Sequence, residues 1–194
     1  MSRFLFGITA FCGLGAMTMT ATAADDKPVV ILDTTLGPIT IELDRAKAPI
    51  TVDNFLKYVD DGFYDNLIFH RVMPDFMIQG GGFDDQLNEK QTRASIKNES
   101  GNGLSNTRGT IAMARLNAPN SATAQFFINL FDANSRLDSY GGGYTVFGKV
   151  TAGMDVVDAI AKVQTTTKST AKGNLEDVPV KPIYIKSAKR KAKS

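Results

Sequence analysis

Apolar and polar residues alternate along much of the chain with the period of two that is typical of half-buried strands. Residues 29–34 form an apolar, β-branched run, and residues 39–43 alternate after the turn signal Leu36-Gly37-Pro38. These two segments are predicted to form a hairpin with one buried face. Further short strands are predicted at residues 67–72, 76–79, 109–114, 126–130, 145–150 and 182–187.

Two other segments carry the 3.6-residue period of a helix packed against a core. The first begins at Pro49 and ends at Gly62, and the second spans residues 154–163. Because a parallel sheet needs a crossover helix between most of its strands, two helices are too few for one. The apolar residues of the first segment recur at i, i+3, i+4 and i+7, namely Val52, Phe55, Leu56 and Val59.

The elements therefore favour a mostly β protein, in which eight antiparallel strands close into a barrel and two helices cap its open ends. No internal repeat and no linker rich in Pro or Ser interrupts the sequence. One domain is expected over residues 27–188, followed by a basic C-terminal tail at residues 189–194. We interpret the tail as a solvated end, and contact with anionic components of a cell envelope is the alternative.

Residues 1–23 have the layout of a secretory signal peptide. Arg3 gives a positive start, residues 4–19 carry no charge, and Ala21-Thr22-Ala23 has the small-x-small form of a cleavage site. A membrane anchor is the alternative, but a spanning helix needs about 20 strongly apolar residues, and several Thr and Gly dilute this segment. Cleavage is expected after this motif or after Ala24, with no stable membrane insertion afterwards. Export to a bacterial periplasm fits best, and eukaryotic secretion stays open.

Composition excludes several kinds of site. The 194 residues include one Cys, at position 12, and one His, and the formal net charge is +2. A disulfide framework, a structural zinc site and a two-histidine metal site all lack ligands, so no metal or cofactor is expected. The small net charge does not indicate a nucleic-acid partner. Signal cleavage would remove Cys12 and leave a chain without thiols, which suits an oxidising compartment.

The candidate chemistry is concentrated in residues 69–81, which read Phe-His-Arg-Val-Met-Pro-Asp-Phe-Met-Ile-Gln-Gly-Gly. The charged Arg71 stands there among apolar residues. Strand alternation predicts that Phe69, Arg71 and Met73 share one face of the sheet, and the following turn would bring Gln79 back toward Arg71. An arginine at a strand end that reaches water is the alternative interpretation.

A second candidate cluster comprises residues 109–115 and 121–128, for which ordinary core strands are the alternative. The glycine triplets at residues 80–82 and 141–143 lack the Gly-Lys-Ser/Thr sequence of a phosphate-binding loop. We therefore expect them to serve strand-end bulges and tight turns.

Taken together, these segments resemble the cyclophilin-type peptidyl-prolyl cis–trans isomerases. Residues 69–81 match the family's most diagnostic stretch. The segments Gly-Thr-Ile-Ala-Met-Ala (109–114), Ser-Ala-Thr-Ala-Gln-Phe-Phe-Ile (121–128) and Val-Phe-Gly-Lys-Val (146–150) match later blocks. The likeness runs over about residues 29–187 and looks closest to the exported bacterial branch.

The resemblance implies an eight-stranded antiparallel barrel with a helix at each end and a proline site on its outer face. It implies an isomerase without a cofactor, which rotates X–Pro bonds of unfolded or partly folded polypeptides and assists the folding of exported proteins. We expect the protein to act as a monomer.

The resemblance also implies roles for individual residues. Arg71 would be the catalytic arginine, with His70 as its neighbour and Gln79 beside it. An apolar pocket for the proline ring and an adjoining groove would bind the substrate through Phe76, Met77, Phe127, Leu137, Ala114, Arg115, Gln125 and Tyr144.

Three positions depart from the family's usual residues. Arg136 stands where many members have Trp, Tyr144 where many have His, and Arg115 where Asn is frequent. In the family that Trp helps to bind cyclosporin, so weaker inhibition by the drug is expected here. Arg115 is expected to add positive charge to the groove.

Two other functions share part of this pattern. A non-catalytic peptide-binding or chaperone module could use the same barrel, and a small-molecule carrier of the lipocalin type is also a barrel. The intact set of Arg71, Phe76, Gln79 and Phe127 favours catalysis over peptide binding alone. A carrier needs an open apolar interior, whereas bulky residues are expected to fill this barrel.

Overall fold

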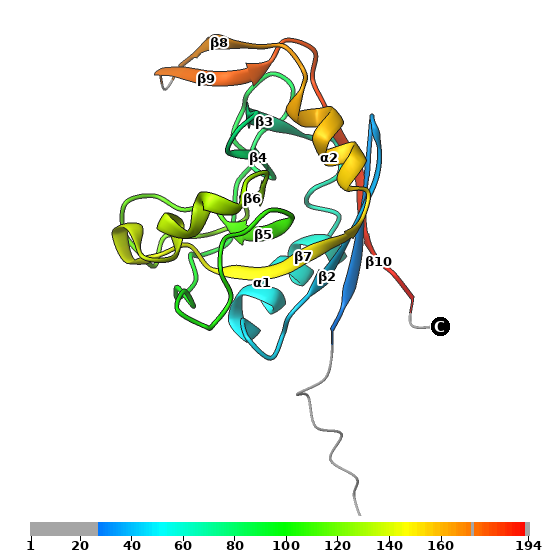
Figure 1. The fold of residues 1–194 in the computed structure, drawn as a ribbon. Coiled ribbons are helices and arrows are strands. Elements are labelled where there is room, and N and C mark those ends of the chain that lie inside the picture. Colours follow the sequence, from blue (N-terminus) through cyan, green and yellow to red (C-terminus); the bar gives the residue numbers. More distant parts are fainter. Residues whose placement is uncertain (1–26, 172, 193–194) are drawn as a thin grey trace, which may run out of the picture.

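The structure, a computed structural model, describes residues 27–171 and 173–192, so the predicted signal peptide lies outside the described residues. Eight strands close into a barrel in the order β1-β10-β3-β4-β6-β5-β7-β2, and each neighbouring pair is antiparallel (Figure 1). This architecture confirms the fold predicted from the sequence. The barrel strands are β1 (Val29–Thr34), β2 (Gly37–Leu43), β3 (Leu67–Met73), β4 (Met77–Gly80), β5 (Thr110–Met113), β6 (Phe126–Asn129), β7 (Val146–Ala152) and β10 (Tyr184–Arg190).

Inward-facing side chains fill the barrel. Val30 and Leu32 on β1 are fully buried, as are Ile39 and Ile41 on β2, whereas the residues between them keep partial exposure. Because burial of one such side chain contributes about 1.5–3 kcal/mol, this alternation is sufficient to select which face turns inward. The packed interior agrees with the expectation that argued against a carrier barrel.

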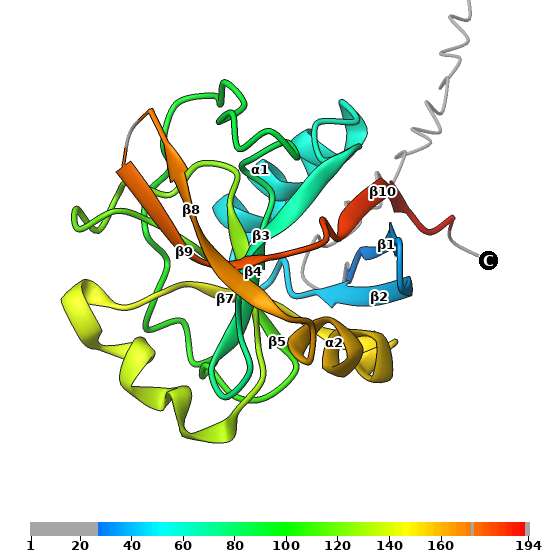
Figure 2. The same cartoon turned by 90° about the horizontal axis from the view of Figure 1, so that it is seen from above.

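Two helices lie at opposite ends of the barrel (Figures 1 and 2). They are α1 (Pro49–Asp60) and α2 (Met154–Ala161), close to the ranges predicted from periodicity. The start of α1 is held by a distant residue, because the Glu99 carboxylate accepts hydrogen bonds from the backbone N–H groups of Ile50 (3.1 Å) and Thr51 (2.8 Å). A carboxylate suits the positive end of the helix dipole. Neither helix among the described residues is long and apolar enough to cross a membrane.

A hairpin outside the barrel was not predicted from the sequence. It pairs β8 (Thr165–Thr170) with β9 (Gly173–Pro179), and β9 packs along β3. In Figure 2 the hairpin crosses in front of the barrel at the level of β3 and β4. Its strands contain few apolar residues, so the period-two pattern that marks the barrel strands is weak here.

The basic C-terminal residues belong partly to the barrel. β10 continues to Arg190, and the backbone N–H of Lys191 donates to the carbonyl of Val29 at 2.7 Å. Arg190 also donates to both carboxylate oxygens of Asp60, with Nε at 2.7 Å. Arg190, predicted to lie in a separate tail, therefore joins the last strand to α1.

Candidate active site

A row of four residues crosses the outer face of the barrel. Arg71 on β3 lies opposite Gln79 on β4, Gln79 lies opposite Phe127 on β6, and Phe127 lies opposite Ala112 on β5. Because side chains alternate between the two faces of a strand, the residue after or before each of them points into the core. Phe126 shows this, since its ring packs in the main core while that of Phe127 lies in a separate outer cluster.

A β-bulge gives Arg71 its outward direction. Phe69 pairs with Gly80 and Arg71 with Gln79, so β3 contains one more residue than β4 between these pairs. Phe69 packs in the main core, whereas Arg71 lines a cavity on the outside. The prediction that these two residues share one face is therefore wrong, because the extra residue shifts the alternation by one position.

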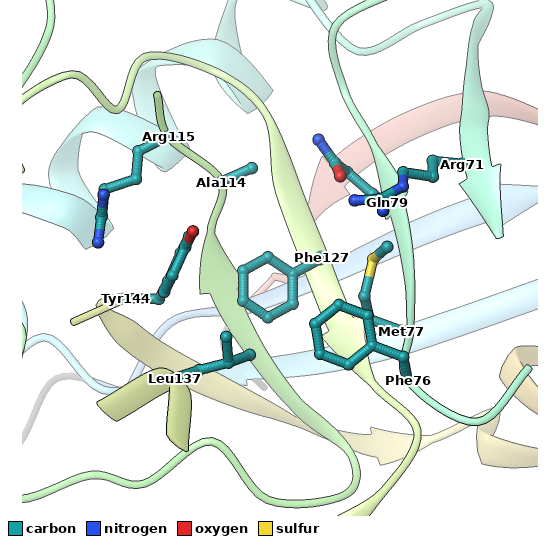
Figure 3. A pocket seen from close by; sticks show the side chains of 9 residues that line it. All are labelled: Arg71, Phe76, Met77, Gln79, Ala114, Arg115, Phe127, Leu137 and Tyr144. Carbon is teal, nitrogen blue, oxygen red and sulfur yellow. The ribbon is translucent and has the colours of Figure 1, made fainter. Parts of the chain in front are cut away.

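The outer row borders a cavity of about 210 Å³ (Figure 3). Phe127 lies at its centre, with Phe76 and Met77 on one side and Leu137 and Tyr144 on the other. Met77 and Phe127 are almost completely buried, so the floor of the cavity is apolar. The structure thus brings together nine of the eleven expected site residues, which are Arg71, Phe76, Met77, Gln79, Ala114, Arg115, Phe127, Leu137 and Tyr144.

Gln125, a tenth expected residue, does not line this cavity but supports a residue that does. Its Oε1 accepts a hydrogen bond from Nε2 of Gln79 at 2.9 Å. The Gln125 side chain passes so close to Gly82 that a Cβ on that glycine would lie 2.6 Å from it. The glycine triplet therefore leaves room for the amide pair, in addition to its use at the end of a strand.

The guanidinium of Arg115 lines the cavity and also holds a loop in place. Nε donates to the carbonyl of Gly143 (3.0 Å), and the two Nη groups donate to the carbonyls of Leu116 (2.9 Å), Tyr140 (3.0 Å) and Gly141 (2.9 Å). Its planar group also stacks over the ring of Tyr144, 4.3 Å from the centroid. With its donors engaged in this way, Arg115 forms a rigid wall of the cavity.

The same wall continues in two short 3-10 segments, η2 (Asp132–Asp138) and η3 (Tyr140–Gly142), the second of which accepts hydrogen bonds from Arg115. The carboxylate of Asp138 accepts hydrogen bonds from Ser105 and from the backbone and side chain of Asn106. Burial acts to raise the pKa of Asp138, but these hydrogen bonds outweigh it and the pKa is lowered. This anchor fixes Leu137 at the rim. Arg136 is exposed and lines a neighbouring hollow instead of the cavity.

His70, the eleventh expected residue, is the extra residue of the bulge and does not line the cavity. It is 4% exposed, its ring lies 4.6 Å from that of Phe83, and its Nδ1 has no hydrogen-bond partner among the described residues. Burial, assisted by the charge of Arg71, lowers the pKa of His70 to about 4. The imidazole is therefore neutral at neutral pH.

The buried histidine gives opposite expectations for activity and stability. Between about pH 6 and 8 kcat/KM should stay constant, because His70 is neutral and Arg71 is charged throughout. The free energy of unfolding should fall as the pH drops from about 6.5 toward 4, by up to about 1.4 kcal/mol per pH unit, because only the unfolded state takes up the proton. His70→Gln should flatten this slope in denaturant titrations. A bell-shaped rate profile that the substitution abolishes would instead identify His70 as an acid or base.

One residue near Arg71 was indicated by no sequence motif. Asp177 on β9 approaches Nε of Arg71 with a carboxylate oxygen at 3.8 Å, and the two side chains are 36% and 42% exposed. The ion pair exists only because the hairpin of β8 and β9 packs along β3. Since that hairpin was not predicted, sequence reasoning had no means of connecting the two residues.

Three comparisons relate the chain to known proteins. Residues 29–190 match the family model described as cyclophilin type peptidyl-prolyl cis-trans isomerase/CLD. A peptidyl-prolyl cis-trans isomerase of Acinetobacter baylyi is 52% identical over 183 residues, covering 92% of this chain and 93% of that protein. The peptidyl-prolyl cis-trans isomerase A of Dickeya dadantii is 48% identical over 189 residues, 96% of either chain. A cyclophilin-type isomerase of Cryptosporidium parvum, crystallised in the presence of the dipeptide Ala-Pro, has a TM-score of 0.68 at 26% identity, covering 85% of this chain and 99% of that one.

Proposed function

Because the chain belongs to the cyclophilin-type peptidyl-prolyl cis–trans isomerases and catalyses their reaction, we propose that the cavity around Phe127 holds the substrate proline and that Arg71 is the catalytic residue. The observation that carries this proposal is the row of Arg71, Gln79 and Phe127, which joins a cation, an amide and an apolar floor on one exposed face. A proline in a peptide presents the matching chemistry, an apolar ring next to a polar amide.

The reaction requires little more than such a surface. Rotation about an X–Pro bond is opposed by conjugation of the amide, with a barrier of about 18–20 kcal/mol. When the bond is twisted, conjugation is lost and the proline nitrogen regains a basic lone pair. No covalent bond forms or breaks, so Arg71 serves as a hydrogen-bond donor to the twisted amide and no nucleophile is needed.

Two contributions together account for a useful rate. An acceleration of about 10⁵-fold requires about 7 kcal/mol of transition-state stabilisation. A preorganised donor such as Arg71 is worth about 3–4 kcal/mol, on the scale of one oxyanion-hole donor. The apolar floor formed by Met77 and Phe127 clamps the ring, and the groove beside Ala114 holds the preceding residues. Both favour the twisted geometry over the planar one, which supplies the remainder.

A rate assay separates this proposal from binding alone. In a protease-coupled assay, the protein should accelerate cis–trans exchange of a short X–Pro peptide in proportion to its concentration. A module that only binds peptides would retain affinity for the same peptide without changing the exchange rate.

We further propose that the protein works as a monomer in the periplasm, on unfolded or partly folded polypeptides that have just been exported. The charge and small-residue layout of residues 1–23 supports export. A match over 96% of the chain must include residues ahead of position 29, where the family model begins, so the similarity to the Dickeya isomerase extends into this leader. The leader also contains Cys12, so cleavage yields a thiol-free enzyme.

N-terminal sequencing of protein from a periplasmic extract should yield a chain that begins at Ala24 or Asp25, because cleavage is expected after Ala23 or Ala24. Replacing Ala21 and Ala23 by Leu should block cleavage and leave a longer, membrane-associated chain. Recovery of the unmodified protein with Met1 in place, embedded in the membrane fraction, would contradict export with cleavage.

A further inference from the structure

We propose that Asp177 is a positioning residue for the reaction, which orients the guanidinium of Arg71 from the hairpin outside the barrel. The inference rests on the proposed role of Arg71. Its basis is the ion pair in which Nε of Arg71 lies 3.8 Å from Oδ2 of Asp177. The hairpin that supplies this carboxylate is a two-stranded sheet of its own and adds no strand to the barrel.

The backbone of β9 is irregular at the residue that makes this contact. Thr166 pairs with Val178 and Lys168 with Leu175, so two residues of β9 face one residue of β8. Asp177 belongs to this bulge and has φ of +58°, in the left-handed region that Asp tolerates better than most residues. Such bulges redirect side chains and are frequent beside active sites.

Arg71 also follows a bulge, since β3 has its own register shift between Phe69 and Arg71. The irregular strands β3 and β9 pack along each other and bring Arg71 and Asp177 together there. Val178, the next residue of β9, is fully buried and fixes the depth at which the carboxylate lies. Bulges therefore set the backbone on both sides of the contact, and the two side chains that span it are only partly exposed.

The ion pair with Asp177 limits rotation of the Arg71 guanidinium plane. A guanidinium on a three-carbon stem loses catalytic value if its plane rotates freely, because donors help only where charge develops in the transition state. The closest approach of the Asp177 carboxylate is to Nε, at the base of the guanidinium. Restraint at that atom fixes the plane and does not depend on the terminal Nη groups, which are the donors best placed to reach a substrate.

The test compares two substitutions that keep the backbone of Asp177 unstrained. Asn and Gly both tolerate positive φ, so Asp177→Asn and Asp177→Gly remove the charge without forcing β9 to move. We expect each to lower kcat about 2- to 5-fold on an uncharged X–Pro peptide, the scale of a partly exposed ion pair, with KM almost unchanged. The matched control is Glu176→Gln, which removes an exposed carboxylate from the same bulge and should leave kcat as it is.

Salt and a double-mutant cycle supply readouts that a purely structural role would not move. Raising ionic strength from about 0.05 to 1 M screens the pair, so kcat of the unmodified enzyme and of Glu176→Gln should fall toward the value of Asp177→Asn, which should not respond. In an Arg71→Lys background, Asp177→Asn should change kcat by no more than about 1.5-fold, because the group it orients is gone. Thermal melting of every variant shows whether the hairpin stays folded.

Each outcome decides one proposal. If Arg71→Lys lowers activity while Asp177→Asn keeps the unmodified kcat and salt response, the role of Asp177 is refuted and the proposed site stands. Equal effects of Asp177→Asn in both backgrounds would also refute it, since the residue would then act independently of Arg71. If Arg71→Lys is fully active, the proposed catalytic residue is itself wrong.

Discussion

Arg71→Lys is expected to lower kcat/KM for X–Pro peptides by about 10²–10³-fold, and Arg71→Ala by more. The lysine keeps the positive charge but loses the fixed planar fork, which donates in directions that a flexible ammonium cannot hold. The loss corresponds to about 3–4 kcal/mol in the transition state. Peptide affinity should change far less, because the donor acts mainly on the twisted bond.

Folding should survive both substitutions, because the Arg71 side chain is 42% exposed on the outer face. Thermal melting and peptide affinity, measured on the same samples as kcat/KM, separate the possible outcomes. If Arg71→Lys turned over X–Pro peptides at the unmodified rate, Arg71 would only contribute positive charge to the edge of the cavity and would not be the catalytic residue. Failure of both variants to fold would show that the arginine holds the barrel together instead.

Phe126→Ala and Phe127→Ala, at adjacent positions, are expected to differ in their effect on the activity of the folded protein. Phe127→Ala removes the floor of the cavity on which the proline ring would rest, and loss of about 1.4 kcal/mol of contact in the transition state would lower kcat/KM about 10-fold. Phe126→Ala removes a ring that packs against Phe55, Tyr64 and Phe69 inside the barrel. It should cost about 3–5 kcal/mol of unfolding free energy.

Denaturant titration and the rate assay on both variants test this division. Phe127→Ala should lose activity even at temperatures where it is fully folded, although removal of this buried ring from the outer cluster also lowers the free energy of unfolding. Phe126→Ala should keep most of its activity at temperatures where it is folded. Equal loss of activity in the two variants would mean that the outer row is not the substrate surface.

The elements and most of the site were predictable because they depend on local periodicity and on contiguous motifs. The alternation that identifies β2 in the sequence is the same alternation that buries Ile39 and Ile41. The 3.6-residue period that identifies α1 marks the helix face that packs on the core. Nine of eleven expected site residues meet at one cavity because they lie on neighbouring strands or in the segments next to them, and barrel closure fixes the order of those strands. Strand register and short motifs therefore predict which residues meet at the site.

The features that sequence reasoning missed depend on irregular backbone and on contacts between distant segments. One extra residue in β3 moves Phe69 inward and buries His70, and alternation alone cannot indicate where a bulge lies. The loop that Arg115 holds was not foreseen, because the carbonyls that accept its hydrogen bonds come from residues about 25 positions later. The pairing of Asp177 with Arg71 required a hairpin with little apolar content to be placed first.

The proposed proline site lies on the outside of a filled barrel, and this position affects which prolines it could reach. A site inside a barrel admits only what fits through its mouth, and would favour free ends or short peptides. The row from Arg71 to Phe127 instead follows the exterior of the sheet, so a long chain can lie across it and continue in both directions. From the proposed site we therefore expect the enzyme to act on prolines in the middle of a polypeptide as well as near its ends, without threading or releasing a chain end in each turnover.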